Sequence, residues 1–122
     1  MAIKVLAIDD SYTIREMLRT ALSEAGFQIE LAFDGLDGLA KLNECRPDVV
    51  VTDINMPRMD GFSFLRAVRS GGQHPALPIL VLTTEGATDM KNRARDEGAT
   101  AWIVKPFDRK KLISAIKRVT VE

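Results

Sequence analysis

The sequence predicts an α/β domain with a five-stranded parallel sheet flanked by five helices, and three observations support this prediction. Short apolar runs alternate with stretches of helical periodicity along the whole chain. The first, third and fourth runs are almost continuous Val, Ile and Leu, as in strands that helices cover on both faces. Several runs end in side chains that can carry chemistry, which suits the carboxyl edge of a parallel sheet.

The chain begins with a strand, a helix and a second strand. The five segments predicted as strands are 5–8, 29–33, 49–51, 79–82 and 101–104. The first helix has a start signal at Ser11 or Thr13 and a stop signal at Gly26. Its apolar stripe comprises Ile14, Met17, Leu18, Ala21 and Leu22.

An Asp-Gly pair precedes each of the next two helices. The second helix follows Asp34-Gly35 and ends before Arg46-Pro47. Its predicted apolar residues are Leu36, Leu39 and Leu42. The third helix follows Asp60-Gly61 and ends at Gly71-Gly72. Its predicted apolar residues are Phe62, Phe64, Leu65 and Val68.

The last two helices differ in their apolar content. The fourth, 87–97, is the most polar, with Met90 and Ala94 as a thin stripe before Gly98, so we expect it to be the least firmly packed. The fifth, 108–119, has a Lys/Arg-rich face opposite its apolar one. That apolar face comprises Leu112, Ile113, Ile116 and Val119. Since the chain ends just after this helix, we expect a complete protein.

Composition narrows the class of protein. The length of 122 residues suits one domain. The sequence contains neither a signal-peptide pattern nor an apolar run long enough for a membrane span. We therefore expect a soluble intracellular protein. The single cysteine, Cys45, is expected to be half-buried near a helix end. Net charge is zero, yet residues 1–90 carry minus five and 91–122 plus five. No basic stretch is interleaved with aromatic residues, so nucleic-acid binding is not favoured.

Polar side chains follow four of the predicted strands. Asp9-Asp10 follow the first, Asp53 the third, Thr83-Thr84 the fourth and Lys105 the fifth. In an open parallel sheet the carboxyl ends of the strands border one crevice, where ligands bind. We therefore expect these side chains to meet there.

The converging side chains favour phosphoryl transfer. Carboxylates that lie together repel one another unless a cation neutralises them, and Mg²⁺ binds through one or two carboxylates and phosphate oxygens. Asp9 or Asp10, with Asp53 and the backbone carbonyl of Asn55, can supply such ligands, while Lys105 adds a fixed positive charge. Asp53 is then the nucleophile that forms an acyl phosphate.

Two residues can report the reaction to the rest of the domain. The Thr83 hydroxyl can donate to an oxygen of the new phosphoryl group. Trp102 precedes Lys105 on the same strand and points to the opposite face. A side chain that changes its partner between two charge states can bias a two-state equilibrium.

Each of these features also has a simpler structural interpretation. Asp9-Asp10 can be the cap of the following helix, and Thr83-Thr84 can be a turn. Lys105-Pro106 can be a plain strand exit, with a trans or a cis peptide bond, and Trp102 can be a packed aromatic. The joint occurrence of these residues at strand ends favours the functional interpretation.

With these residues identified, the chain resembles the receiver domain of two-component response regulators, and within it the single-domain chemotaxis regulators of the CheY type. The resemblance rests on Asp9-Asp10, Asp53-Ile54-Asn55-Met56-Pro57, Met59-Asp60-Gly61, Thr83 with Glu85, and Lys105-Pro106-Phe107. It covers essentially all 122 residues. It implies one receiver domain over 1–122, with a doubly wound, flavodoxin-like sheet of strand order 2-1-3-4-5.

The resemblance also implies roles for the site residues. Asp53 is expected to accept the phosphoryl group from the phosphohistidine of a kinase, and Thr83 and Lys105 to contact its oxygens. The implied Mg²⁺ ligands are Asp10, Asp53 and the Asn55 carbonyl, with Asp9 assisting. The chain is then expected to catalyse only its own phosphorylation and dephosphorylation, and not to be an enzyme for other substrates.

Two residues depart from the usual pattern of this family. Trp102 takes the place of a switch aromatic that is usually Tyr or Phe, and Thr84 is larger than the common Ala. Both changes bear on how the domain switches, and Thr84 also bears on access to the site. Asn55 and Glu85 match positions that influence how fast water or a phosphatase reaches the phosphoryl group.

The resemblance places the output surface on the fourth helix, the fifth strand and the fifth helix. This part of the chain contains the basic surplus of Lys91, Arg95, Arg109, Lys110 and Lys111, which suits an acidic or amphipathic partner segment. The expected partners are a sensor histidine kinase of the CheA type and a flagellar motor switch protein or a phosphatase. We expect a cytoplasmic monomer that contacts neither membrane nor nucleic acid.

Other functions are also compatible with parts of the sequence. Within the receiver class, a phosphate sink or relay intermediate remains an alternative to a motor-binding regulator. A Mg²⁺-dependent phosphatase of the haloacid dehalogenase kind also uses an Asp nucleophile, but places it after the first strand and needs a cap. A flavodoxin-type flavin module needs a Ser/Thr/Gly-rich phosphate loop where this chain has Asp9-Asp10-Ser11.

Overall fold

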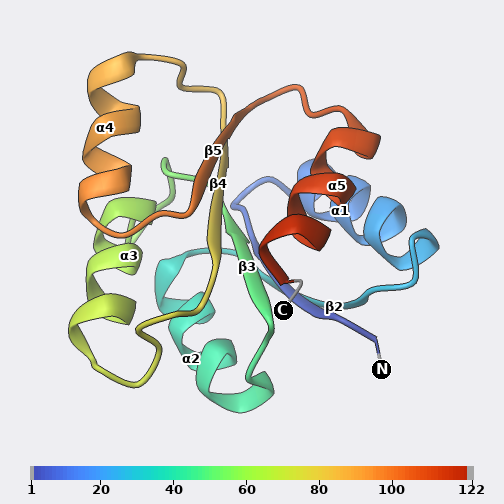
Figure 1. Cartoon of the computed structure of the whole chain (residues 1–122), viewed down its shortest axis with the longest axis horizontal. Coiled ribbons are helices and arrows are strands. Elements are labelled where there is room, and N and C mark those ends of the chain that lie inside the picture. Colours follow the sequence, from blue (N-terminus) through green and yellow to red (C-terminus); the bar gives the residue numbers. More distant parts are fainter. Residues whose placement is uncertain (1, 121–122) are drawn as a thin grey trace.

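The computed structural model describes residues 2–120, which form one parallel sheet with helices on both faces (Figure 1). Within these residues the strand order is β2-β1-β3-β4-β5, which confirms the predicted order. The strands are β1 (Lys4–Ile8), β2 (Gln28–Ala32), β3 (Val49–Thr52), β4 (Ile79–Thr83) and β5 (Ala101–Val104). The helices are α1 (Tyr12–Glu24), α2 (Gly35–Cys45), α3 (Gly61–Ser70), α4 (Thr88–Asp96) and α5 (Arg109–Thr120).

The sheet separates two apolar cores. Figure 1 shows α1 and α5 on one face and α2, α3 and α4 on the other. Neighbouring residues of β1 point to opposite faces, so Val5 packs with the α1/α5 core and Leu6 with the α2/α3/α4 core. Burial on both faces explains why β1, β3 and β4 read as continuous apolar runs.

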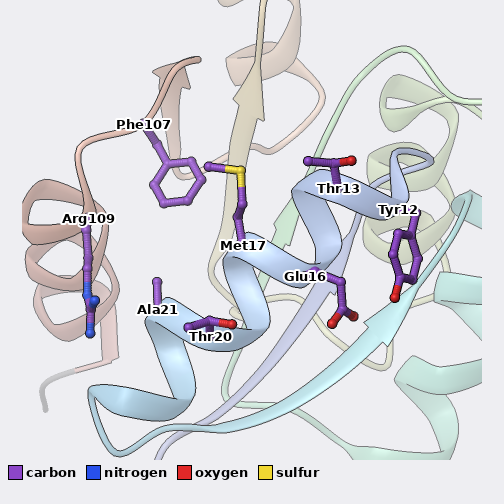
Figure 2. A pocket seen from close by; sticks show the side chains of 8 residues that line it. All are labelled: Tyr12, Thr13, Glu16, Met17, Thr20, Ala21, Phe107 and Arg109. Atoms are coloured by element: carbon purple, nitrogen blue, oxygen red, sulfur yellow. The ribbon is translucent and has the colours of Figure 1, made fainter.

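Helix α1 begins and ends at the predicted signals, but one predicted core residue is exposed. The Ser11 hydroxyl accepts a hydrogen bond from the Ile14 amide, and Gly26 takes a left-handed φ of 92° after the helix. Met17 was predicted to lie on the buried stripe, and this prediction is wrong, because 49% of the residue is exposed. It lies at the flank of the buried face and points into the groove beside α5 (Figure 2).

Two predictions around helix α2 are also wrong. Leu36 is 43% exposed, because α2 buries the face that contains Gly35 and Gly38. A Cβ on Gly38 would lie 2.5 Å from a methyl group of Ile8, so α2 packs closely through residues that a hydrophobic pattern ignores. Phe33 was predicted to end the second strand, but β2 ends one residue earlier and Phe33 is 49% exposed.

The remaining helices agree with the predictions. The four predicted apolar residues of α3 are all buried. Within α4 Ala94 is the buried residue, and no side chain caps the amino end of this helix, as expected for the least firmly packed one. Helix α5 buries Leu112 and Ile116 and leaves Ile113 and Val119 partly exposed.

Two predictions from composition can be compared with the structure. Cys45 is the last residue of α2 and is half-buried, as predicted, and burial raises the pKa of its thiol. Across residues 2–120, every helix is too short or too polar to cross a bilayer.

Candidate functional site

Three carboxylates meet at the carboxyl edge of the sheet. Asp9 follows β1 and is 1% exposed, Asp10 beside it is exposed, and Asp53 follows β3 and is 8% exposed. Each has a carboxylate oxygen within 4.8 Å of one from each of the others. The structure therefore brings together the three aspartates that the sequence predicted to converge.

Lys105 connects the two buried carboxylates. Its Nζ donates to Oδ2 of Asp9 at 2.7 Å and to Oδ2 of Asp53 at 2.9 Å. The other oxygen of Asp53, Oδ1, accepts from the backbone N–H of Ile54 at 2.6 Å. Lys105 itself follows β5, and its peptide bond to Pro106 is cis. These contacts fix the orientation of the Asp53 carboxylate.

Burial and hydrogen bonding act in opposite directions on Asp9 and Lys105. The pKa of Asp9 is raised because burial disfavours its charged form more than hydrogen bonds from Lys105 and the Ser11 amide favour it. Burial also acts to lower the pKa of Lys105, but its bonds to Asp9 and Asp53 outweigh that effect and raise it. Lys105 is therefore positively charged at neutral pH. Further positive charge nearby would stabilise the ionised form of Asp9.

The donor set fits a hard divalent cation. Three carboxylates and one ammonium leave two negative charges in excess, and oxygen ligands of this kind suit Mg²⁺. Asn55, whose carbonyl was predicted to complete the set, lies two residues after Asp53 in the loop between β3 and α3. Its exposed side chain extends toward Glu85, with Nδ2 and Oε1 3.5 Å apart, so these two residues lie on the rim of the site.

Thr83 and Trp102 both bond to the backbone of Glu85. Thr83 is the buried last residue of β4, and its hydroxyl accepts from the Glu85 N–H at 3.3 Å. That bond leaves the hydroxyl proton for another acceptor. The Trp102 indole N–H donates to the Glu85 carbonyl at 2.9 Å, and its half-buried ring packs against the α2/α3/α4 core. Thr84, by contrast, is exposed.

The simpler interpretations account for part of these contacts. Ser11, and not Asp9 or Asp10, caps α1, although Asp9 accepts from the Ser11 amide in the turn before it. Trp102 packs against the α2/α3/α4 core and is hydrogen-bonded, which agrees with the simpler interpretation of a packed aromatic. Neither observation removes the carboxylates from the site, because Asp9 still contacts Lys105.

The predicted output residues lie on two separate parts of the surface. Lys91 and Arg95 of α4 line a shallow pocket together with Trp102. Lys111, in the first turn of α5, is exposed but does not line that pocket. The structure thus brings two of the five predicted basic residues, Lys91 and Arg95, next to the predicted switch aromatic.

Sequence reasoning missed two arginines near the site. Nη1 of Arg15, on α1, donates to the Asp9 carbonyl at 2.7 Å. Arg58, in the loop after β3, forms a two-pronged ion pair with Asp34, the N-cap residue of α2. The position of Arg15 in the first turn of the predicted helix, just after Asp9, could have indicated its contact with Asp9. Nothing in the sequence pattern connects Arg58 with Asp34.

Exposed apolar side chains surround the carboxyl edge of the sheet. Among residues 2–120 the large exposed hydrophobic residues are Tyr12, Met17, Phe33, Leu36 and Val104. Each lies near the end of a strand or in the first turns of the following helix. Figure 2 shows the groove between α1 and the start of α5, where Met17 points toward Phe107.

Comparisons with known proteins agree on one family. The model of the response regulator receiver domain matches residues 5–117. Response regulator MprA of Mycobacterium bovis is 38% identical over 117 residues, which are 96% of this chain and 50% of MprA. The chain thus spans about half the length of the curated relatives it matches.

Solved structures give the same result. The chemotaxis protein CheY4 of Vibrio cholerae is 45% identical, with a TM-score of 0.92 over 98% of this chain and 99% of that one. The receiver domain of Francisella response regulator 1452 is 31% identical, with a TM-score of 0.90 over 97% and 96% of the two chains.

Proposed function

Because this chain belongs to the receiver-domain family of response regulators, we propose that it accepts a phosphoryl group from a histidine kinase on Asp53 and then signals through phosphorylation-dependent protein binding. The observation that carries this proposal is the Asp53 carboxylate, held between Lys105 and the Ile54 amide beside two further aspartates. The domain acts as a catalyst only of its own phosphorylation and dephosphorylation. It works as a cytoplasmic monomer.

The transfer step follows from the contacts of Asp53. A carboxylate oxygen of Asp53 forms a bond to phosphorus while the bond between phosphorus and the donor's imidazole nitrogen breaks, and that nitrogen keeps the electron pair. Lys105 stands 2.9 Å from Oδ2 and neutralises part of the charge on the incoming group. The Thr83 hydroxyl donates to a phosphoryl oxygen. Asn55 and Glu85, on the rim, govern the approach of the water that later hydrolyses the acyl phosphate.

Mg²⁺ is the cofactor that the donor set suits. Asp10, Asp53 and the Asn55 carbonyl would hold it, with Asp9 assisting, because their charge excess matches a dication. When bound, Mg²⁺ neutralises negative charge on the phosphoryl oxygens.

The phosphodonor docks over the carboxyl edge of the sheet. Its phosphohistidine must reach Asp53, which is 8% exposed, so the donor's surface has to cover the loops around that residue. Exposed Tyr12 and Met17 of α1, near Phe107, give this edge an apolar border. We assign this border to the surface of the histidine kinase around its phosphohistidine.

The signal leaves through Glu85 and Trp102. When the Thr83 hydroxyl turns to a phosphoryl oxygen, the Glu85 backbone moves, and with it the acceptor of the Trp102 indole. Lys91 and Arg95 beside Trp102 then bind an acidic or amphipathic partner segment. Charge reversal at Lys91 should weaken that binding, and unchanged partner affinity would refute this output surface.

Chemotaxis is the output that we favour, with a flagellar motor switch protein as partner and a CheA-like kinase as donor. The likeness to CheY4 over nearly the whole of both chains supports it. A phosphate sink or relay intermediate is the second candidate, because the same site can drain a kinase without any output partner. A haloacid dehalogenase-like phosphatase is disfavoured, since the nucleophile here follows β3 and not β1.

Fluorescence of Trp102, the single tryptophan, tests the proposal. The protein is titrated with Mg²⁺ and then with the phosphoryl analogue beryllofluoride, alongside an Asp53→Asn control. We expect saturable responses to both additions in the native protein and loss of the analogue response in the control. Silence toward the analogue, together with failed phosphotransfer from a histidine kinase, would refute the assignment of Asp53.

A further inference from the structure

The loop that contains Asn55 is closed at its base. It connects β3 with α3, and the Gly61 N–H donates to the Ile54 carbonyl at 2.8 Å across its ends. A Cβ on Gly61 would lie 2.4 Å from the carbonyl oxygen of Asp53, so backbone approaches backbone here at a distance that only glycine allows. The loop therefore starts and ends against the strand that carries the phosphoacceptor.

The far side of this loop is tied to a different element by Arg58. Its Nε donates to Oδ2 of Asp34 at 2.5 Å and its Nη2 donates to Oδ1 at 3.1 Å. This is the paired geometry in which an arginine orients a carboxylate most firmly. Arg58 makes the contact with a left-handed φ of 64°, which is unfavourable for a residue with a side chain.

Asp34 is a rigid anchor for that contact. It is 1% exposed, and its Oδ1 also accepts from the Asp37 amide as the N-cap of α2. The next residue, Gly35, donates its N–H to the Met59 carbonyl at 3.1 Å. Two neighbouring residues of the loop, Arg58 and Met59, are thus fixed to two neighbouring residues at the start of α2.

We infer that Arg58 is a positioning residue for the cation site: its ion pair with Asp34 holds the loop 54–60 so that the Asn55 carbonyl is in place before the metal binds. The inference rests on the proposed function, in which that carbonyl is a ligand. Residues that orient metal ligands without touching the metal change affinity because the ligands otherwise have to be ordered on binding.

Charge alone predicts a different pattern from positioning. Arg58 is a cation, so its removal would strengthen Mg²⁺ binding if its effect were only electrostatic repulsion. Asp34 is an anion, so its neutralisation would weaken binding on the same basis. Positioning predicts that both changes weaken binding, and that the double change is no worse than either single one, because both break the same contact.

The experiment measures the dissociation constant of Mg²⁺ by isothermal titration at constant ionic strength. The variants are Arg58→Met, Asp34→Asn, which keeps a side chain able to cap α2, and the pair combined. Arg46→Met is the matched control, because Arg46 is also exposed and left-handed, with a φ of 47°, at the opposite end of α2. We expect about tenfold weaker binding in the three test variants, the lower end of the range for residues that orient ligands, and native affinity in the control.

Three outcomes overturn the inference. Tighter Mg²⁺ binding by Arg58→Met would show that Arg58 acts only through its charge. Native affinity in both single variants would show that the Arg58–Asp34 ion pair does not position the loop. A native protein that binds no Mg²⁺ would overturn the proposed cation site and the inference together. Should Arg58→Met fail to fold, Arg58→Lys keeps the charge but loses the fork, and weaker binding is expected there as well.

Discussion

Replacing Gly61 by alanine tests whether close backbone packing beneath Asp53 supports the site. The new Cβ would lie 2.4 Å from the Asp53 carbonyl oxygen and 2.8 Å from the Cα of Ile54. Both neighbours are backbone atoms of the two residues that follow β3, so neither can move aside as a flexible side chain can. The change should therefore displace the loop and Asp53, the proposed phosphoacceptor.

The expected size of this effect follows from those contacts. Overpacking in a well-packed interior costs about 1–3 kcal/mol, and contact with backbone on two sides places this substitution near the upper limit. With an unfolding entropy of about 2.1 cal/mol/K per residue, a loss of about 3 kcal/mol lowers the melting temperature of a chain this long by about 12 °C. Mg²⁺ affinity should fall as well, because the substitution displaces Asp53.

Urea unfolding and calorimetry measure the stability, and titration measures the Mg²⁺ affinity. Gly86→Ala is the matched control, since a Cβ there meets its nearest atom, on Val104, at an ordinary 3.9 Å. Surface substitutions usually change the free energy of unfolding by less than about 0.5 kcal/mol. If Gly61→Ala changed it no more than that, the reasoning from close approach would be refuted.

Three further predictions concern charge and signalling. Lys105→Met leaves two buried carboxylates without their cation. Urea unfolding without metal should therefore show a free energy of unfolding lower by about 3 kcal/mol, and Mg²⁺ should partly restore it. An unchanged stability would contradict the ion pairs. The hydrogen bonds from Arg58 lower the pKa of Asp34, so this carboxylate contributes stability that is complete above its unfolded pKa of about 3.9 and is lost as the pH falls through its folded value. Urea unfolding of Arg58→Met should thus depend less on pH across that acidic range than unfolding of the native protein, and equal dependence would count against the pair. Thr83→Ala should keep Mg²⁺ binding but lose the fluorescence response of Trp102 to beryllofluoride, and a full response would exclude the route through the hydroxyl.

The fold and the centre of the site could be predicted because they follow from topology. Parallel strands place their carboxyl ends at one edge, so Asp9, Asp53 and Lys105 had to come close once their strands were recognised. The three aspartates therefore agree with that prediction, and the sheet order agrees with what the resemblance to receiver domains implies. The prediction depended only on which residues end each strand, and not on how many residues separate them in the sequence.

Packing details could not be predicted in the same way. Periodicity identified the apolar side of α2 but not that Gly35 and Gly38 make its closest contacts, so Leu36 was assigned to the core wrongly. The pair of Arg58 with Asp34 joins two loops, where no periodic pattern exists to align residues. Such contacts depend on the path of the backbone, which composition and spacing do not encode.

The backbone of Glu85 is shared by two side chains: its N–H bonds to Thr83 and its carbonyl to Trp102. A connection through one residue's backbone works in both directions, because linked binding equilibria are reciprocal. A protein that grips the tryptophan surface more tightly when Asp53 bears a phosphoryl analogue must raise the affinity for that analogue by the same factor. A partner that binds the Trp102 surface would thereby also stabilise the phosphoryl analogue at Asp53.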